Sequence, residues 1–141
     1  MNIDYNYCIW LINNKINNWE KKEKGFLTHM SIKTHLKKNE AILLFNQIKK
    51  DIDFIKLTIN SELIESNDES GFNALYYNVS GNKKFSWWPD NAHVSFHYKY
   101  NEAFSIKDKE YKPKKNWCIF NDIIIMKCTG HHKDWTQLYL K

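Results

Sequence analysis

The sequence predicts one α+β domain, built mainly from strands with one clear helix packed against them. Hydrophobic residues make up 43% and aromatic residues 16% of the 141 residues, which is enough for one hydrophobic core. Short segments rich in β-branched and aromatic residues recur between turn signals, and one segment has the period of an amphipathic helix. We therefore expect a single domain over residues 1–141, without a linker or a fixed-period repeat.

The first elements follow from local composition. Tyr5–Ile12 is aromatic and β-branched enough for a buried strand, and residues 13–25 (NNKINNWEKKEKG) favour a short helix that ends at Gly25. Thr28–Leu36 alternates polar and apolar residues and predicts a second strand.

The next segment, residues 37–50, is the predicted amphipathic helix. Asn39 is its expected N-cap, and Lys49 and Lys50 lie in its last turn. Its apolar positions follow the i, i+3, i+4, i+7 pattern: Ala41, Leu44, Phe45 and Ile48.

The rest of the chain predicts a sheet. Asp53–Glu65, Phe72–Ser80 and His93–Tyr100 have strand composition and are separated by turn-rich segments. The charged segment Lys107–Lys115 predicts a mobile loop, and Asn116–Cys128 one or two late strands.

Charge and cysteine content narrow the class of protein. The formal net charge is +5, and all 21 basic residues are lysines. A bound phosphate would therefore contact lysine ammonium groups and not the bidentate guanidinium group of an arginine. Three cysteines without a C-x-x-C pair predict free thiols in a reducing compartment: Cys8, Cys118 and Cys128. With no signal pattern and no apolar run long enough to span a bilayer, we expect a cytoplasmic protein without a membrane partner. The excess of Lys, Asn and Ile indicates an AT-rich genome, such as that of a large DNA virus, a protist or a low-GC bacterium.

Two segments repeat one motif. HMSIKTHL (residues 29–36) and HVSFHYKY (residues 93–100) both begin with histidine, an apolar residue, serine and an apolar residue. Two such hits among six histidines are expected by chance in roughly one in 200 chains of this composition. Side chains alternate along a strand, so the polar residues of each motif should share one face. The predicted polar faces are His29, Ser31, Lys33 and His35, and His93, Ser95, His97 and Lys99, with Val94, Phe96, Tyr98 and Tyr100 opposite the second set.

These motifs start 64 residues apart (93 − 29 = 64), and the chain resembles the two-histidine (2H) phosphoesterases, also called LigT-like. In that family, two His-apolar-Ser/Thr-apolar motifs lie in separate halves of the chain. The resemblance covers most of the chain, including a late apolar strand, a polar loop and a final strand in residues 122–140. It implies a two-lobed fold of antiparallel sheets flanked by helices around a central cleft, and phosphodiesterase activity without metal or other cofactor.

The resemblance also implies a small nucleotide as partner. Family members act on 2′-5′ oligoadenylates, on cyclic dinucleotides such as cGAMP, on nucleoside 2′,3′-cyclic phosphates or on RNA ends. The AT-rich coding and the absence of an appended domain favour a compact, monomeric viral enzyme that removes host nucleotide signals, which in this family means cleaving 2′-5′ bonds. A 2′,3′-cyclic nucleotide or RNA-end phosphodiesterase is the alternative within the same family.

Cleavage of a phosphodiester needs a base and an acid on opposite sides of phosphorus, and histidine serves in both roles near neutral pH. We assign His29 and His93 as the acid and base, without deciding which is which. Ser31 and Ser95 are assigned as hydroxyl donors to the non-bridging phosphate oxygens. Four further residues are candidates for substrate binding, two as base-stacking platforms and two as phosphate contacts: Trp87, Trp88, Lys33 and Lys99.

Two other kinds of function stay open. The histidines of the two motif strands could hold zinc, although neither motif adds a cysteine or carboxylate at matching spacing. A binding module without catalysis could hold a nucleotide or RNA through its lysines and aromatic residues. His131 and His132 are predicted to form an exposed turn, and residues 107–115 a solvated loop or a lid.

Overall fold

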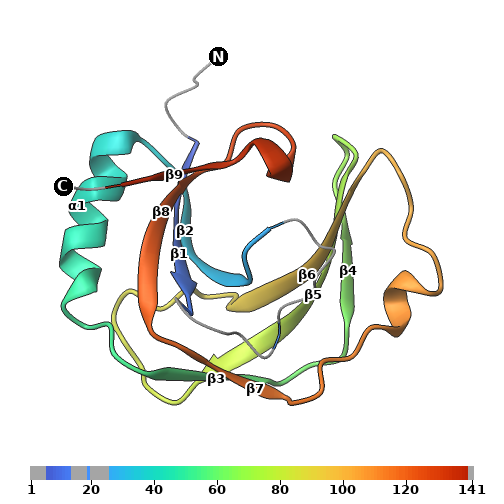
Figure 1. The fold of residues 1–141 in the computed structure, drawn as a ribbon, viewed down its shortest axis with the longest axis horizontal. Helices are drawn as coiled ribbons and strands as arrows, with labels where there is room; N and C mark the ends of the chain where they lie inside the picture. Colours follow the sequence, from blue (N-terminus) through green and yellow to red (C-terminus); the bar gives the residue numbers. More distant parts are fainter. Residues whose placement is uncertain (1–5, 14–18, 20–25, 140–141) are drawn as a thin grey trace.

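Antiparallel strands dominate the fold, and they are accompanied by one α-helix in the described part of the chain, as the α+β prediction requires. The computed structural model describes residues 6–13, 19 and 26–139 (Figure 1). The short helix predicted at residues 13–25 lies outside this description apart from positions 13 and 19. The strands are β1 (Tyr7–Ile12), β2 (His29–Leu36), β3 (Ile55–Ile59), β4 (Ile64–Asn67), β5 (Phe72–Gly81), β6 (His93–Tyr100), β7 (Trp117–Phe120), β8 (Asp122–Lys127) and β9 (Thr136–Leu138). Within the described residues, the α-helix is α1 (Lys38–Lys49), and short 3-10 helices are η2 (Asp108–Glu110) and η3 (His132–Asp134).

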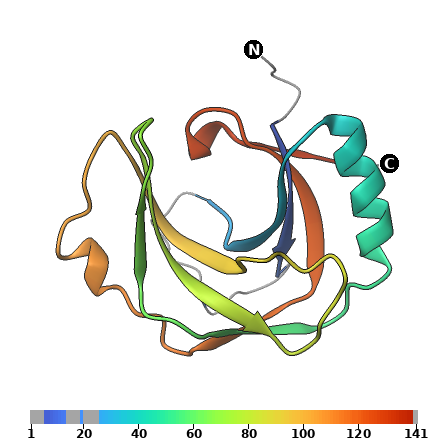
Figure 2. The ribbon, with the colours of Figure 1, turned by 180° about the vertical axis from the view of Figure 1, so that it is seen from behind.

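The strands form one nine-stranded sheet in the order β7-β3-β5-β6-β2-β1-β8-β9, with β4 added beside β5. Figures 1 and 2 show that this sheet is strongly curved, with α1 on its outer side next to β8 and β1. Strands β1, β2, β8 and β9 form one part of the sheet, and β3 to β7 form the other. The two parts meet where β2 pairs with β6, so the seam of the sheet runs between the two motif strands.

The main core lies on one face of the curved sheet. Along β1, Ile9 and Leu11 belong to this core, whereas Trp10 alternates with them and belongs to a smaller cluster on the other face. Helix α1 adds Ala41 and Ile48 to the main core. No helix in the described ranges is long and apolar enough to cross a membrane.

Helix α1 confirms the predicted amphipathic segment but begins two residues earlier than expected. The backbone N–H of Lys37 donates to the Glu40 carboxylate at 2.9 Å, which makes Lys37 the N-cap residue. The prediction of Asn39 as N-cap is therefore wrong, and Asn39 lies in the first turn. The predicted apolar face packs inward, with Ala41 and Ile48 buried and Leu44 and Phe45 half-buried against the core.

Two predicted strand segments are each divided in the structure. Asp53–Glu65 contains β3 and only the first two residues of β4, which continues to Asn67; the two strands are separated near Ser61, whose hydroxyl accepts the backbone N–H of Asn78 at 2.9 Å. Both β3 and β4 pair with β5, so the two parts of this segment have the same neighbouring strand. Asn116–Cys128 contains β7 and β8, separated at Asn121; here the neighbour does change, because β7 pairs with β3 and β8 with β1.

Candidate active site

The two motif strands lie side by side and antiparallel, with Met30 opposite Val94. In an antiparallel ladder the residues flanking such a pair also face each other, which places the histidine of each motif beside the serine of the other. Met30 and Val94 are fully buried in the main core, so the flanking residues point to the opposite face of the sheet. We call these four residues the quartet: His29, Ser31, His93 and Ser95.

The quartet has the two histidines at opposite corners. His29 lies beside Ser95 and therefore two residues along the partner strand from His93. Diagonal positions of this kind have Cα atoms about 7–8 Å apart, with Cβ atoms somewhat closer. The serine of each motif occupies one of the other two corners.

Both imidazole rings are held by the same type of contact. His29 Nδ1 lies 2.7 Å from the carbonyl oxygen of Leu27, and His93 Nδ1 lies 2.8 Å from the carbonyl oxygen of Asn91. A carbonyl oxygen only accepts, so Nδ1 carries the hydrogen in each ring. In each case the carbonyl belongs to the residue two positions before the histidine, so Nε2 is the basic nitrogen of the neutral ring.

The surroundings of the two histidines differ. His29 is only 4% exposed, and its ring is stacked on Trp10 with centroids 3.5 Å apart and planes 7° apart. Phe26 meets the same ring edge-on at 6.1 Å. His93 is half-buried beside Tyr76, whose ring centroid is 4.7 Å away. His29 is thus enclosed by aromatic rings, whereas His93 lies nearer to solvent.

One cavity, of about 620 Å³, brings several predicted site residues together. We call it the Trp87 cavity, and its lining includes His93 and Ser31 of the quartet with Lys33, Trp87 and Trp88. The two tryptophans also pack on the main core. Each indole ring therefore packs on the main core on one side and lines the Trp87 cavity on another.

Each of these tryptophans is fixed by a specific neighbour. Trp87 is stacked on Phe85 at 4.7 Å and donates from its indole nitrogen to Asp51 at 3.0 Å, just beyond the end of α1. Trp88 lies over Gly81, so closely that a Cβ atom there would be 2.6 Å from the indole ring. The wall of the Trp87 cavity is therefore preorganised.

A second cavity, of about 240 Å³, lies on the other side of the quartet. We call it the Trp10 cavity; Ser31 and Thr34 line both cavities, and His29 lines only this one. Its remaining aromatic lining consists of Trp10, Phe72, Tyr98 and Trp135. Burial raises the pKa of Tyr98 well above its usual value, against a smaller opposing effect of a hydrogen bond with Ser95, so the phenol is neutral.

The predicted polar face of the second motif holds only for its first half. The register between β5 and β6 shifts by one residue between Ser95 and His97, which is a β-bulge. An extra residue reverses the alternation beyond it, so Tyr98 joins the quartet on its face of the sheet. His97 and Lys99 point the other way, and the prediction that they share a face with His93 and Ser95 is wrong.

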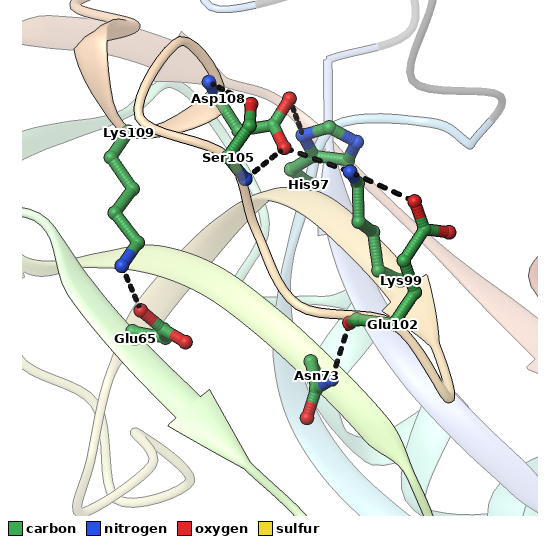
Figure 3. Close-up of polar contacts among 8 residues, drawn as sticks. All are labelled: Glu65, Asn73, His97, Lys99, Glu102, Ser105, Asp108 and Lys109. Carbon is green, nitrogen blue, oxygen red and sulfur yellow. Dashed lines mark hydrogen bonds and ion pairs between the residues drawn. The ribbon is translucent and has the colours of Figure 1, made fainter.

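Lys99 is engaged in ion pairs on that opposite face (Figure 3). Its ammonium lies 2.9 Å from Asp108 and 3.4 Å from Glu102, and His97 Nδ1 lies 3.7 Å from Asp108. Burial opposes the charge of Asp108, but Lys99 and the N–H and hydroxyl of Ser105 outweigh it and hold the pKa of this carboxyl well below its usual range. The carboxylate in turn raises the pKa of Lys99. The structure does not bring Lys99 to the quartet.

The charged segment after β6 is tied to the sheet at several points. Lys109 pairs with Glu65 of β4 at 2.8 Å, and the Asn73 side chain donates to the carbonyl oxygen of Glu102 at 2.7 Å (Figure 3). Residues 108–110 form η2 instead of continuous loop. The segment predicted as a mobile loop or lid is thus anchored on the face of the sheet away from the quartet.

The histidines outside the quartet do not join it as a group. His35, at the exposed end of β2, adopts a left-handed φ of 58° and lies at the edge of the Trp10 cavity, while His97 is on the other face. In the described ranges, no three His, Cys, Asp or Glu side chains are grouped as a metal site would require. The zinc alternative therefore lacks a ligand set within the residues that the structure describes.

The prediction of an exposed turn at His131 and His132 is wrong. Both rings are half-buried and pack on Tyr100, with centroids 4.3 and 5.7 Å away. The backbone N–H of His132 donates to the Tyr100 hydroxyl at 3.0 Å. This cluster continues the aromatic surface of the Trp10 cavity toward the end of β6.

Sequence reasoning missed the aromatic residues around His29. Trp10 had a usable signal, because it alternates with Ile9 and Leu11 in a strand and so had to face away from the core. Trp135 had no such signal, since it precedes a three-residue strand whose position depends on β8.

In comparisons with known proteins, no family model, no curated protein and no solved structure matches this chain.

Proposed function

We propose that this protein is a metal-independent phosphodiesterase of the 2H phosphoesterase kind that hydrolyses 2′-5′ phosphodiester bonds in small nucleotide signals. The observation that carries the proposal is the quartet, in which two His-x-Ser motifs from distant parts of the chain meet at one antiparallel seam. Their histidines occupy opposite corners, and each has its Nδ1 bound to a backbone carbonyl. In-line displacement at phosphorus needs a base and an acid on opposite sides of the phosphate, and two oriented imidazoles at diagonal positions of one strand pair support these roles.

In the proposed reaction, one imidazole accepts the proton of the attacking oxygen through Nε2. The other, protonated, donates a proton to the leaving oxygen on the opposite side of phosphorus. The bond from phosphorus to the leaving oxygen breaks as the bond to the attacking oxygen forms. In a 2′-5′ linkage the attacking group is either water or the vicinal 3′-hydroxyl, which gives a 2′,3′-cyclic phosphate.

The serines at the other two corners support the charge that develops. Ser31 and Ser95 lie on the quartet face, where their hydroxyls can donate to the non-bridging oxygens of the phosphate. Ser95 is 6% exposed, so a hydrogen bond from it acts in a largely water-excluded environment. These roles require no metal ion.

The Trp87 cavity supplies the binding surface next to this centre. Lys33 lines the same cavity as Ser31 and His93, so its ammonium can neutralise phosphate charge from one side. Trp87 and Trp88 offer aromatic faces for stacking a nucleobase. The proposed setting is a monomeric enzyme in the host cytoplasm, with a viral origin and the removal of innate immune nucleotide signals as its purpose.

The test is turnover in EDTA of 2′-5′ oligoadenylate, 2′,3′-cGAMP, 3′,3′-cGAMP and a 2′,3′-cyclic nucleotide. We expect cleavage of the 2′-5′-linked members by the wild type, and loss of that cleavage in His29→Ala and in His93→Ala. His97→Ala is the matched control, because this histidine lies on the other face of the sheet and lines neither the Trp10 nor the Trp87 cavity.

Other outcomes of this assay assign a different function. Cleavage of only the cyclic nucleotide would point to a 2′,3′-cyclic nucleotide or RNA-end phosphodiesterase. Binding of nucleotides without any turnover would point to a binding module. Activity that EDTA abolishes would contradict the metal-independent mechanism.

A further inference from the structure

The aromatic surface on the His29 side of the quartet continues well beyond the reacting groups. The Trp10 cavity shares Phe72 and Trp135 with a neighbouring cavity of about 410 Å³. We call the latter the His131 cavity, after the histidine that lines it together with Tyr100. The two cavities lie side by side along the ends of β5 and β6 with the rings of Phe72 and Trp135 as shared walls, and together we call them the recess.

This recess and the Trp87 cavity lie on opposite sides of the quartet. Ser31 lines both the Trp10 and Trp87 cavities, whereas His29 lines only the former and His93 only the latter. A phosphate held between the histidines therefore has one cavity beside each of its two ester oxygens. In a phosphodiester that joins two nucleosides, each ester oxygen leads to a different ribose and base.

The lining of the recess suits a nucleobase better than a phosphate. In the described part of the chain, no lysine, aspartate or glutamate lines either of its cavities. Its walls combine aromatic rings, histidines included, with uncharged polar and cysteine side chains, and every nucleobase has a π-face that can stack on the rings. At about 240 Å³, the Trp10 cavity is smaller than the roughly 300 Å³ at which typical small-molecule sites begin, so it accommodates one planar ring system.

The aromatic walls are held in place by their neighbours. Trp135 donates from its indole nitrogen to the carbonyl oxygen of Gly130 at 3.1 Å and packs edge-on against Trp10 at 5.7 Å. Phe72 packs on Tyr98 at 5.0 Å but is only half-buried, so part of its ring is open to the recess. A base entering the recess meets preformed surfaces, which limits the entropy lost on binding.

We propose that the Trp10 and His131 cavities bind the second nucleobase of the substrate, with Phe72 and Trp135 as its stacking surfaces. The inference rests on the proposed phosphodiesterase function for the position of the phosphate. The substrate class is then a molecule with a nucleoside on each side of the cleaved bond. Mononucleotide cyclic phosphates, which have only one base, would leave this recess empty.

The experiment compares two 2′-phosphodiesters of adenosine that differ in the leaving alcohol. One is the 2′-5′-linked adenosine dinucleotide, and in the other a methyl group replaces the second nucleoside. We expect Phe72→Leu, which keeps an apolar side chain but removes the aromatic face, to lower kcat/KM for the dinucleotide about 5- to 100-fold. Cleavage of the methyl ester should stay unchanged, and Phe72→Tyr should restore the dinucleotide rate.

Phe54→Leu is the control, because Phe54 is 64% exposed and lines none of these three cavities. Equal loss for both esters, or no loss for either, would overturn the inference while leaving the phosphodiesterase proposal intact. Binding to the His93→Ala variant, measured by calorimetry, gives a readout that needs no turnover. If the wild type cleaves nothing, a Phe72-dependent preference for the dinucleotide in that binding assay still supports the recess, and its absence overturns it.

Discussion

The contact between Gly81 and Trp88 allows a sharp test of how the Trp87 cavity is built. A Cβ atom at Gly81 would lie 2.6 Å from Cη2 and 2.8 Å from Cζ2 of Trp88. Ordinary contacts begin near 3.4 Å, so the ring must move by about 0.8 Å (3.4 − 2.6) to accommodate Gly81→Ala. Gly81 has no left-handed φ, so the cost comes from this contact and not from the backbone.

Overpacking of this kind costs about 1–3 kcal/mol, and the lower entropy of the unfolded alanine chain offsets about 0.4–1 kcal/mol of it. We therefore expect Gly81→Ala to lower the free energy of unfolding by about 1–2 kcal/mol. In a Trp88→Leu background the clashing ring atoms are gone, and the same substitution should cost about zero or stabilise slightly. Urea denaturation of the wild type, both single variants and the double variant measures this coupling.

Gly130→Ala is the matched control for Gly81→Ala. A Cβ atom there meets nothing within 4 Å, but Gly130 has a φ of 72°, so alanine is strained by about 1–2 kcal/mol whatever stands at position 88. If Gly81→Ala cost the same free energy with and without the Trp88 ring, the reasoning about this wall would be refuted. Gly81→Ala should also raise KM for nucleotide, because the displaced ring lines the Trp87 cavity.

Three further predictions concern the two faces of the sheet. Asp108→Asn should lower the free energy of unfolding by about 1–2 kcal/mol at pH 7 and leave turnover unchanged. Because the folded-state pKa of Asp108 is depressed, its contribution to the free energy of unfolding is present above about pH 4 and is lost as the pH falls further. In urea titrations, the difference in free energy of unfolding between the wild type and Asp108→Asn should therefore be smaller at about pH 3 than at about pH 7. Of two matched lysine variants, Lys33→Met should raise KM several-fold and Lys99→Met should not. A raised KM for Lys99→Met and an unchanged KM for Lys33→Met would contradict the placement of Lys33 at the site. The rate should follow a bell-shaped pH profile, since one of His29 and His93 must be neutral and the other protonated, and a flat profile in stopped assays from pH 5 to 9 would exclude this pair.

Strand periodicity and helical periodicity were sufficient to predict the elements that build the site. Alternation along the first motif placed His29 and Ser31 on one face and Met30 on the other, and the structure confirms both faces. The spacing of Ala41 and Ile48 likewise predicted the buried side of α1. These features depend on local geometry, which a sequence pattern records directly.

Features that depend on the partner strand could not be predicted in the same way. The bulge between Ser95 and His97 has no local sequence signal, yet it reverses the face on which Lys99 lies. The stacking of Trp10 on His29 depends on the register between β1 and β2, which itself shifts along the pair. The meeting of the motifs at one seam likewise follows from how β2 and β6 pair, about which neither strand alone carries information.

The most direct test of the central claim is single-turnover cleavage of a 2′-5′-linked adenosine dinucleotide in EDTA by the wild type, His29→Ala and His93→Ala. If the two imidazoles act as acid and base, each substitution should lower the rate by about 100- to 10,000-fold. Circular dichroism and melting temperature should show that both variants remain folded. Near-wild-type cleavage by either folded variant would contradict the assignment of this histidine pair.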